Sequence, residues 1–487
     1  MPTKRVYLET MGCQMNVLDS ELVIGQLCAL GYKPTDDYHT ADLVLINTCS
    51  VRHRAEEKAY SRLTAIARAK TERPNMIIGV IGCMVERDHE GIRQRCPYVD
   101  LLCGPGNLNE IPALLATVEE TRVQAIALEH DHSRRLPSAE RTLLYNSIEE
   151  LDMSRRTPPD GRTLQAYVRV QRGCDKFCSF CVVPFTRGPE RNRPPANIVI
   201  EARRLVDMGA KEITLLGQTI NSYAYTDSST GRTVRLADLL EQVHEIEGLQ
   251  RLRFVTSYPG DFTDDILQAM RDLPKVCEYL HLPAQSGSNA VLKRMRRRYT
   301  AEQYTELIAR ARETVPGISL AGDFIVGFCG ETDAEHAETL ALIERVGYKN
   351  IYMFKYSPRP ATVADRSLPD DVPEAVKKRR HLDLVEYQKR SGLAHHQGFI
   401  GRTVEILVEG FSKAAIKAQE AEQERNNHVS WKRGDQLVGR TRTDEIVVFT
   451  GPKSMIGQLV TVWITAATAL TLHGEADQTS APATVVD

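Results

Sequence analysis

The feature that most constrains the fold is a regular alternation of apolar strand-like runs with amphipathic helical stretches. In the first block, strand patterns lie at 6–13, 42–49 and 76–83, and helical patterns lie at 20–32 and 55–70. The run DLVLINTC (42–49) is almost continuously apolar, as expected of a strand covered on both faces of a parallel sheet. This order predicts an α/β fold that begins with a doubly wound parallel-sheet domain over residues 4–120.

A second alternating block follows. Six strand patterns lie at 164–171, 212–217, 251–257, 278–284, 322–328 and 350–357, each followed by a helical pattern. Six successive strand–helix units predict a partial (βα)6 barrel, in which reactive groups gather at the carboxyl ends of the strands. With a basic helix at 373–392, this domain is placed at residues 164–395.

The remaining segments have other patterns. Beyond residue 400 the hydrophobic period becomes two, which predicts a small antiparallel β-barrel over 398–474, with strands at 402–410, 436–441, 445–451 and 458–474. A polar insertion at 412–435 interrupts it. Residues 121–163 contain Pro, Gly and like charges without periodicity and are predicted to be a linker. The tail, 475–487, is predicted to be disordered.

Composition excludes several protein classes. The chain has 487 residues, of which 42% are hydrophobic and 26% charged, close to the globular average. No apolar run approaches the roughly 18 residues of a membrane-spanning helix, so no membrane association is expected. No secretory signal is visible, which makes the cytoplasm the expected location. In that reducing compartment, eleven cysteines favour metal or catalytic use over disulfides.

The strongest motif is GCDKFCSFC (173–181), directly after the first barrel strand. Its three thiols, Cys174, Cys178 and Cys181, can ligate three irons of a [4Fe–4S] cluster and leave the fourth iron open. Most cysteine-bound clusters have four protein ligands, so three indicate a site that keeps one iron for another ligand. The alternative is a zinc knuckle with a distant fourth ligand, although such knuckles more often contain paired C-x2-C units.

Three further cysteines, Cys13, Cys49 and Cys83, each end an apolar strand of the first block. The carboxyl ends of parallel strands share one edge of a sheet, so we expect these thiols to converge there. Gly12 and Gly82 precede two of them, which lets the backbone approach a bulky cofactor. The alternative is three buried free cysteines, a common state for this residue.

Longer segments carry a family resemblance. The chain closely resembles the methylthiotransferase family of radical S-adenosylmethionine enzymes, and within it the branch that acts on tRNA. The resemblance spans about 460 residues, including a C-terminal barrel like the RNA-binding TRAM domain. It rests on GCQMNVLDSE (12–21), INTCSVRHRAEEK (46–58), IGC (81–83), RGCDKFCSFCVVPFTRG (172–188), LLGQTINSY (215–223), HLPAQSGS (281–288), DFIVGFCGET (323–332) and FKYSPRPAT (354–362).

The resemblance implies two [4Fe–4S] clusters and S-adenosylmethionine as cofactors. Cys174, Cys178 and Cys181 would hold the radical-generating cluster, and Cys13, Cys49 and Cys83 an auxiliary one. The reaction would be methylthiolation of C2 of N6-isopentenyladenosine next to the anticodon. The expected partners are the tRNA substrate and a reductant protein such as flavodoxin or ferredoxin, and the enzyme is expected to be a monomer.

Other positions have less specific roles. Gln218, Ser257, Gln285 and Asp323 are candidate S-adenosylmethionine contacts, or else polar residues satisfied by neighbouring backbone. Phe180 resembles the aromatic residue near the adenine in this family, and its alternative is ordinary packing.

Three features depart from the family pattern: Cys329 in place of Pro, Thr219 in place of Asn, and the insertion at 412–435. Basic clusters at 154–156, 293–298 and 377–380 are either solvated helix faces or phosphate contacts for RNA.

Two alternative functions stay open. One is a sibling methylthiotransferase that acts on threonylcarbamoyl-adenosine in tRNA or on a ribosomal protein. The other is a non-enzymatic iron–sulfur protein that binds RNA, which would need a fourth protein ligand for the central cysteine loop.

Overall fold

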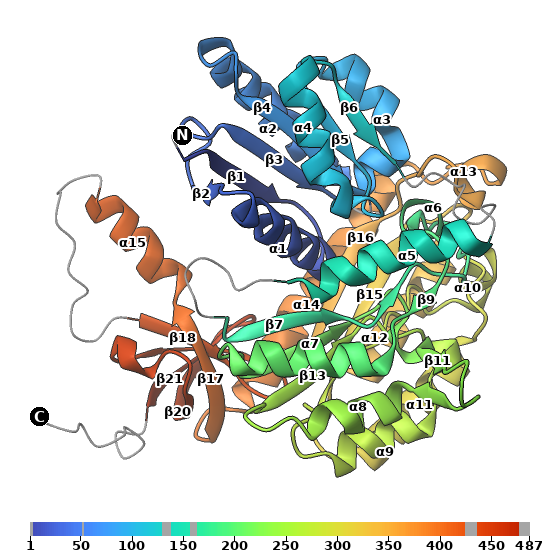
Figure 1. The fold of residues 1–487 in the computed structure, drawn as a ribbon. Coiled ribbons are helices and arrows are strands. Elements are labelled where there is room, and N and C mark those ends of the chain that lie inside the picture. Colours follow the sequence, from blue (N-terminus) through green and yellow to red (C-terminus); the bar gives the residue numbers. More distant parts are fainter. Residues whose placement is uncertain (1–2, 51–52, 129–137, 156–162, 424–435, 477–487) are drawn as a thin grey trace, which may run out of the picture.

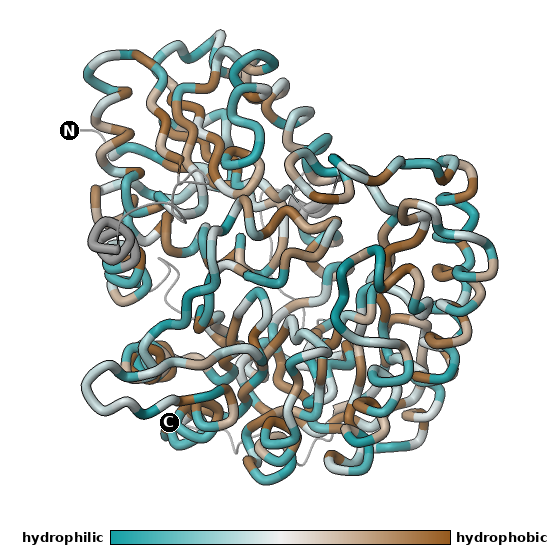
Figure 2. Tube along the Cα trace, turned by 90° about the vertical axis from the view of Figure 1, so that its right-hand side faces the viewer, coloured by the Kyte–Doolittle hydropathy of each residue, from teal (hydrophilic) through white to brown (hydrophobic). Residues whose placement is uncertain are grey.

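The computed structural model describes residues 3–50, 53–128, 138–155, 163–423 and 436–476. Figure 1 shows three regions: an N-terminal α/β region at the top, a partial barrel at the centre and right, and a small β-barrel at the lower left. Figure 2 shows that hydrophobic stretches run through the interior of these regions, while hydrophilic segments lie mostly on the outside.

The N-terminal region is a six-stranded sheet in the order β2-β1-β3-β4-β5-β6, and all its pairings are parallel. The strands are β1 (Arg5–Thr10), β2 (Lys33–Pro34), β3 (Leu43–Thr48), β4 (Ile77–Gly82), β5 (Leu101–Cys103) and β6 (Ala125–Ala127). The helices are α1 (Gln14–Ala29), α2 (His53–Glu72), α3 (Cys83–Arg95), the 3-10 turn η1 (Leu108–Glu110) and α4 (Ile111–Thr121).

Two separate hydrophobic cores cover the two faces of this sheet. Leu43 and Leu45 of β3 pack with α1 and α4, whereas Val44 and Ile46 pack with α2 and α3. Successive strand residues point to opposite faces, so a strand covered on both sides must be apolar throughout. The predicted doubly wound parallel sheet is confirmed.

The range 121–163, predicted to be a linker, contains two regular elements. The three residues of β6 extend the sheet beside β5, and α5 (Ser138–Met153) follows them. Leu151 of α5 joins the hydrophobic core that α1 and α4 share. The prediction missed β6 because three residues are too few to show a period, and its strand character comes from pairing with β5.

The central region contains two three-stranded parallel sheets, β13-β10-β7 and β14-β15-β16. Their strands are β7 (Gln165–Arg169), β10 (Glu212–Leu216), β13 (Arg251–Val255), β14 (Tyr279–His281), β15 (Ser319–Val326) and β16 (Asn350–Lys355). A single parallel bridge between Leu252 and Val276 joins the two sheets beside β13. The six strands lie where the sequence predicted them, and the partial (βα)6 barrel is confirmed.

Helices surround these strands. They are α6 (Val183–Thr186), α7 (Pro195–Asp207), α8 (Leu236–His244), α9 (Asp264–Asp272), α10 (Asn289–Arg294), α11 (Ala301–Thr314), α12 (Asp333–Val346), α13 (Val363–Ser367) and α14 (Glu374–Gln397). Short pieces connect them: β8 (Gln171–Arg172), β9 (Arg191–Asn192), η3 (Ile220–Ser222), β11 (Ala224–Thr226), β12 (Thr233–Arg235) and η4 (Pro259–Asp261).

The C-terminal region is a closed barrel in the order β17-β18-β19-β21-β20. Its strands are β17 (Thr403–Phe411), β18 (Gln436–Arg440), β19 (Ile446–Thr450), β20 (Leu459–Ala467) and β21 (Leu472–Ala476), with η5 (Lys453–Met455) between β19 and β20. The predicted single strand at 458–474 is two strands, because a turn from Thr468 to Thr471 separates them.

The barrel is not wholly antiparallel as predicted, because β19 and β21 pair in parallel. Alternating directions cannot close around an odd number of strands, so one seam of a five-stranded barrel must be parallel. Within the insertion, α15 (Lys413–Gln423) is helical, and residues 424–435 lie outside the described residues, as does nearly all of the predicted tail.

This small barrel packs against the amino ends of the central strands. Arg251, the first residue of β13, donates to the carbonyl of Arg440 (2.6 Å) and pairs with Glu405 (3.2 Å). Arg442 pairs with Glu278, just before β14 (2.7 Å). The carboxyl ends of the central strands, where the cysteine loop begins, are therefore at the opposite end of the partial barrel (Figure 1).

Candidate functional site

The central cysteine loop, residues 173–181, connects β8 to the segment that precedes α6. Gly173 has φ +69°, and a Cβ there would lie 2.0 Å from the carbonyl oxygen of Pro189, so the position requires glycine. The amide of Cys174 donates to the Gly188 carbonyl (3.2 Å) and that of Cys181 to the Cys178 carbonyl (3.0 Å). These contacts fix the path of the loop that carries the three thiols.

The three thiols of this loop lie close enough to affect one another. Burial, with a smaller contribution from the nearby Cys178, raises the pKa of Cys174 to about 11. Burial and the Cys178 and Cys174 thiols also raise the pKa of Cys181. Metal ligation needs thiolates, so cofactor assembly at this loop must release protons.

A zinc ion and a [4Fe–4S] cluster require different spacings of their thiol ligands. No three His, Cys, Asp or Glu side chains of the described residues lie close enough together to hold one metal ion. The sulfurs around a single zinc lie within about 4 Å of one another. A [4Fe–4S] cluster attaches each thiolate to a different iron and so tolerates wider spacing. Three thiols on one loop are a donor set that a [4Fe–4S] cluster can use.

Arg297 is a neighbour of this loop that the sequence did not single out. Its Nη1 donates to Cys178 Sγ (3.4 Å), and its Nε donates to the Tyr299 hydroxyl (2.9 Å). Its guanidinium also lies over the rings of Tyr258 and Tyr299. Arg297 belongs to the basic cluster 293–298, whose charge pattern could not reveal that this one side chain points inward.

The strand-end cysteines lie on one edge of the N-terminal sheet. Cys13 caps α1, Cys49 follows β3, and Cys83 begins α3 directly after β4. The strand order places Cys49 between the other two. The pKa of Cys83 is raised by burial and by the neighbouring Cys13, which indicates that these two thiols are close.

The glycines that precede Cys13 and Cys83 are needed for different structural reasons. Gly82 has φ +96°, and a Cβ there would lie 2.5 Å from the Thr48 carbonyl oxygen. Gly12 has no such φ, and a Cβ would instead meet the Asn16 side chain at 2.8 Å. Asn16 also accepts from Cys13 Sγ and donates to the Asn47 side chain (3.0 Å). Close packing beneath the cysteines thus explains both glycines.

Two arginines from the central region reach these cysteines. Arg187, just after α6, lies beside Cys83 and Cys13. Burial lowers its pKa, but its interactions with Cys83, Asp19 and Cys13 raise it overall. Its Nη2 donates to Asp19 (2.9 Å) and to Asn16 (3.1 Å). Arg359 lies beside Cys49 and pairs with Glu56 (3.0 Å). Both arginines stand in the family-like segments, but nothing local in the sequence indicates which cysteines they approach.

Ser257, Gln285 and Asp323 come together, with Ser257 just after β13, Gln285 after β14 and Asp323 within β15. The Ser257 amide donates to the His281 carbonyl (3.2 Å), and the His281 ring contacts Asp323 (3.3 Å). The Gln285 amide donates to the Asp323 carbonyl (2.8 Å), and Gln285 itself has φ +69°. His281, which links two of the predicted residues, was not predicted.

The same region fits a polar ligand. The Ser257 hydroxyl is buried and has no hydrogen-bond partner among the described residues. A buried polar atom without a partner is costly, and it marks a place where a ligand group or water completes the bonding. Gln218, half-buried after β10, has no hydrogen bond to the other three within the described chain. Amino, carboxylate and ribose groups of S-adenosylmethionine suit these surroundings.

Comparison with known proteins adds independent evidence. Residues 5–104 match Uncharacterized protein family UPF0004, residues 168–343 match the Radical SAM superfamily, and residues 427–476 match the TRAM domain. The tRNA-2-methylthio-N(6)-dimethylallyladenosine synthase of Rhodopirellula baltica is 47% identical over 474 residues, covering 97% of this chain and 95% of that protein. The chain belongs to the methylthiotransferase family of radical S-adenosylmethionine enzymes. The synthase of the same name from Moorella thermoacetica is 43% identical, with 96% and 97% covered.

Solved structures support the fold of this methylthiotransferase. The radical S-adenosylmethionine methyltransferase TsrM from Kitasatospora setae superposes with a TM-score of 0.51 at 14% identity, covering 72% of this chain and 73% of that one. Within the described residues of the methylthiotransferase, no helix is long and apolar enough to cross a membrane. All eleven cysteines are free thiols in the structure.

The departures from the methylthiotransferase pattern have structural explanations. Cys329 is buried in a small core with Phe328, Tyr356 and Met295, which gives it a packing role. Thr219 donates its amide to Gln171 Oε1 (3.1 Å) and its hydroxyl to Glu190 (3.3 Å). Phe180 meets Phe328 edge to face at 6.4 Å, at the border of the same core.

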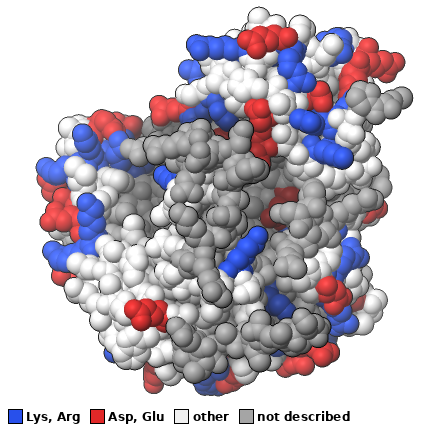
Figure 3. Space-filling model, turned by 90° about the vertical axis from the view of Figure 1, so that its left-hand side faces the viewer, with Lys and Arg blue, Asp and Glu red and all other residues white. Residues whose placement is uncertain are grey.

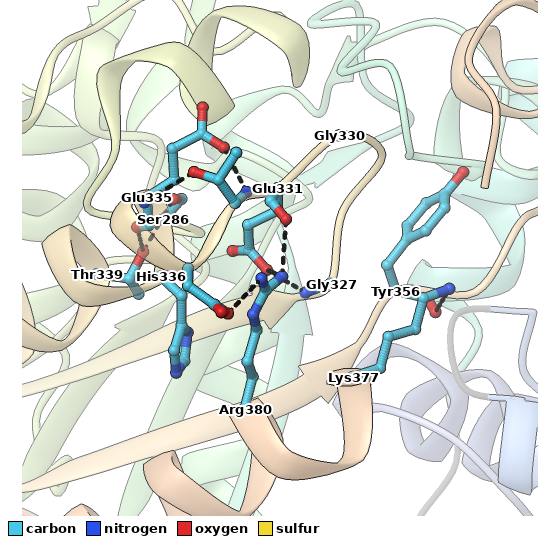
Figure 4. Close-up of polar contacts among 12 residues, drawn as sticks. Ser286, Gly327, Gly330, Glu331, Glu335, His336, Thr339, Tyr356, Lys377 and Arg380 are labelled. Atoms are coloured by element: carbon cyan, nitrogen blue, oxygen red, sulfur yellow. Dashed lines mark hydrogen bonds and ion pairs between the residues drawn. The ribbon is translucent and has the colours of Figure 1, made fainter. Parts of the chain in front are cut away.

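Several side chains of two basic clusters turn inward. In Figure 4, Arg380 points at Glu331 (2.9 Å) below the turn from Gly327 to Gly330, and Lys377 lies beneath Tyr356, where it donates to the carbonyl (3.4 Å). Arg155 is likewise buried and donates to Glu21. These residues of 377–380 and 154–156 stabilise the fold and are not free for phosphate contacts.

Proposed function

We propose that this methylthiotransferase replaces the C2 hydrogen of N6-isopentenyladenosine, next to the anticodon of tRNA, with a methylthio group. The observation that carries the proposal is two groups of three cysteines, each at strand carboxyl ends, in a chain 47% identical to a tRNA-2-methylthio-N(6)-dimethylallyladenosine synthase. Because an adenine C2–H bond is neither acidic nor activated, acid–base catalysis alone cannot functionalise it. Two [4Fe–4S] clusters and S-adenosylmethionine, when bound, supply a carbon radical, the inserted sulfur and the methyl group.

The residues divide into two sites. Cys174, Cys178 and Cys181 hold the cluster at which the sulfonium is cleaved and leave one iron for S-adenosylmethionine. The candidate contacts of that cofactor are Gln218, Ser257, Gln285 and Asp323. Cys13, Cys49 and Cys83 hold the auxiliary cluster. Arg187 and Arg359 contribute positive charge beside those cysteines.

The partners and the location are also proposals. A reductant protein such as flavodoxin or ferredoxin supplies electrons, and the enzyme acts as a monomer in the cytoplasm. On the face drawn in Figure 3, basic and acidic side chains are interspersed, in keeping with a net charge of −2. Binding of tRNA therefore depends on local groups of cations and not on bulk charge.

Paired cysteine variants test the division of labour. After anaerobic reconstitution, Cys13→Ala should form 5′-deoxyadenosine with dithionite but no methylthio nucleoside, whereas Cys178→Ala should form neither. The matched control is Cys28→Ala, which changes a cysteine of the same helix as Cys13 without a proposed role and should retain both activities. Equal loss of 5′-deoxyadenosine in Cys13→Ala and Cys178→Ala, with both proteins folded, would refute the separate roles.

The two alternatives have their own tests. Mass spectrometry of nucleosides from a complemented knockout identifies whether isopentenyladenosine or threonylcarbamoyl-adenosine gains the methylthio group. A spectroscopic change when S-adenosylmethionine meets the reduced protein separates an enzyme from a non-catalytic iron–sulfur protein that binds RNA.

A further inference from the structure

A basic pocket of about 630 Å³ lies against the central cysteine loop, and we call it the loop pocket. Lys176 and Phe177 of the loop form one wall, and residues of α10, α11 and the turn between them form the rest. Its cations are Lys176, Lys293, Arg296, Arg297 and Arg298, and no acidic residue lines it. The pocket therefore favours a negatively charged occupant.

Three of these cations have no internal partner. The side chains of Lys293, Arg296 and Arg298 are exposed and make no ion pair or side-chain hydrogen bond with other described residues. By contrast, Arg380 and Arg155, from the other basic clusters, are buried in ion pairs. Unpaired cations that gather in one place remain available to a partner, whereas paired ones do not.

The loop pocket is also connected to a candidate cluster ligand through one side chain. Arg297 lines it and at the same time donates to Cys178 Sγ (3.4 Å). Phe177, between Cys174 and Cys178, is 37% exposed at its wall. Exposed aromatic residues and arginines are enriched in protein–protein interfaces, and the surrounding cations give this surface a charge that an acidic partner complements. A partner seated here is one side chain away from a ligand sulfur.

The lining argues against the tRNA as occupant. The modified base must reach a point between the two groups of cysteines, and Arg187 and Arg359 mark that side of the central region. No residue of the N-terminal sheet or of the C-terminal barrel lines the loop pocket. A partner that docks there contacts the central cysteine loop without contacting the N-terminal sheet or the C-terminal barrel.

We propose that the loop pocket is the docking site of an acidic electron-donor protein. This rests on the proposed function, since it presupposes a cluster at Cys174, Cys178 and Cys181. In each encounter one electron leaves the reduced donor, which becomes oxidised, and the cluster accepts it, with no atom or proton exchanged. Weak electron-transfer complexes bury small interfaces, and a compact basic surface suffices for one.

Charge reversal tests the site on the full-length, reconstituted protein. The variant Lys293→Glu/Arg298→Glu is compared with Arg203→Glu/Lys389→Glu, which makes the same charge change at exposed positions without ion pairs elsewhere. The probe is a reduced, acidic bacterial flavodoxin. Stopped-flow spectroscopy measures cluster reduction, titration measures the flavodoxin affinity of the cluster-free protein, and filter binding measures tRNA affinity.

The pocket variant should be reduced about tenfold more slowly by flavodoxin than wild type, with a weaker dependence on salt. Its reduction by dithionite, which needs no docking, and its tRNA affinity should be unchanged, and the control variant should behave as wild type. Unchanged flavodoxin kinetics would overturn the proposal. A drop in tRNA affinity with normal flavodoxin reduction would reassign the pocket to RNA. Failure of the proposed function would appear separately, as no 5′-deoxyadenosine from wild type with dithionite.

Discussion

Asp19→Asn should weaken the junction between the N-terminal and central regions. Asp19 is 1% exposed and pairs with both Arg169 (3.1 Å) and Arg187 (2.9 Å), which are 1% and 2% exposed. The substitution keeps the shape of the side chain but removes the charge that compensates two buried cations. Breaking a buried pair in this way costs about 3–5 kcal/mol.

The lower end of that range is expected. Arg169 keeps its pair with Asp152 (2.6 Å), and Arg187 keeps its hydrogen bond to Asn16 (3.1 Å). A loss of about 3 kcal/mol corresponds to a melting temperature roughly 6–12 °C lower for a cooperative unit of about 150–250 residues. Because Arg187 lies beside Cys13 and Cys83, methylthio transfer should fall more than 5′-deoxyadenosine formation.

Scanning calorimetry of the cluster-free, full-length protein measures the change in melting temperature that Asp19→Asn causes. The relevant transition is the one that contains the junction, since a chain with several regions need not unfold in one step. The control is Asp272→Asn, which removes one partner of the exposed Arg271–Asp272 pair and should leave the melting temperature unchanged. A loss below about 1 kcal/mol for Asp19→Asn would show that the buried network does not hold the two regions together.

Four further predictions follow from particular contacts. Replacing all three cysteines of the 173–181 loop with Ala should leave about four irons per chain, by iron analysis, and loss of all iron would contradict independent sites. Arg297→Gln should lower the reduction potential of the central cluster by tens of millivolts in a spectroelectrochemical titration, because a cationic donor to Cys178 Sγ is lost, and an unchanged potential would rule this out. Burial alone would raise the pKa of Glu445. The hydrogen bond with the His395 ring and the charge of Lys349 instead lower this pKa to about 2. Its contribution to stability is therefore complete above about pH 4.5 and is lost as the pH falls toward about 2, so wild type should lose its advantage over Glu445→Gln in melting temperature across that window. Removal of residues 397–487 should lower the melting temperature as well as tRNA affinity, because Arg251 loses its partners in the small barrel. An unchanged melting temperature would argue against a stabilising contact between the small barrel and the central strands.

Much of the fold follows from local patterns in the sequence. Apolar runs long enough to recognise mark the six central strands and the strands that end near Cys13, Cys49 and Cys83. Such runs are continuous because these strands are buried on two faces. The C-x3-C-x2-C spacing determines the central loop by itself, since three thiols within eight residues of one another cannot separate far. Ser257, Gln285 and Asp323 were candidates through the family resemblance, and it is the tertiary structure that brings the three together.

Only the tertiary structure decided where charged side chains point. Charge alone cannot show that Arg297 and Arg380 turn inward while Lys293 and Arg298 remain exposed, because all four stand in similar basic runs. Asp19 and Arg169 are 150 positions apart, and their pairing exists only once the two regions pack. The strand β6 and the parallel seam of the small barrel likewise depend on neighbouring strands and on closure. Local periodicity therefore determined the elements, whereas contacts between distant segments decided the surroundings of the cysteines, since buried charges take partners from whichever element packs against them.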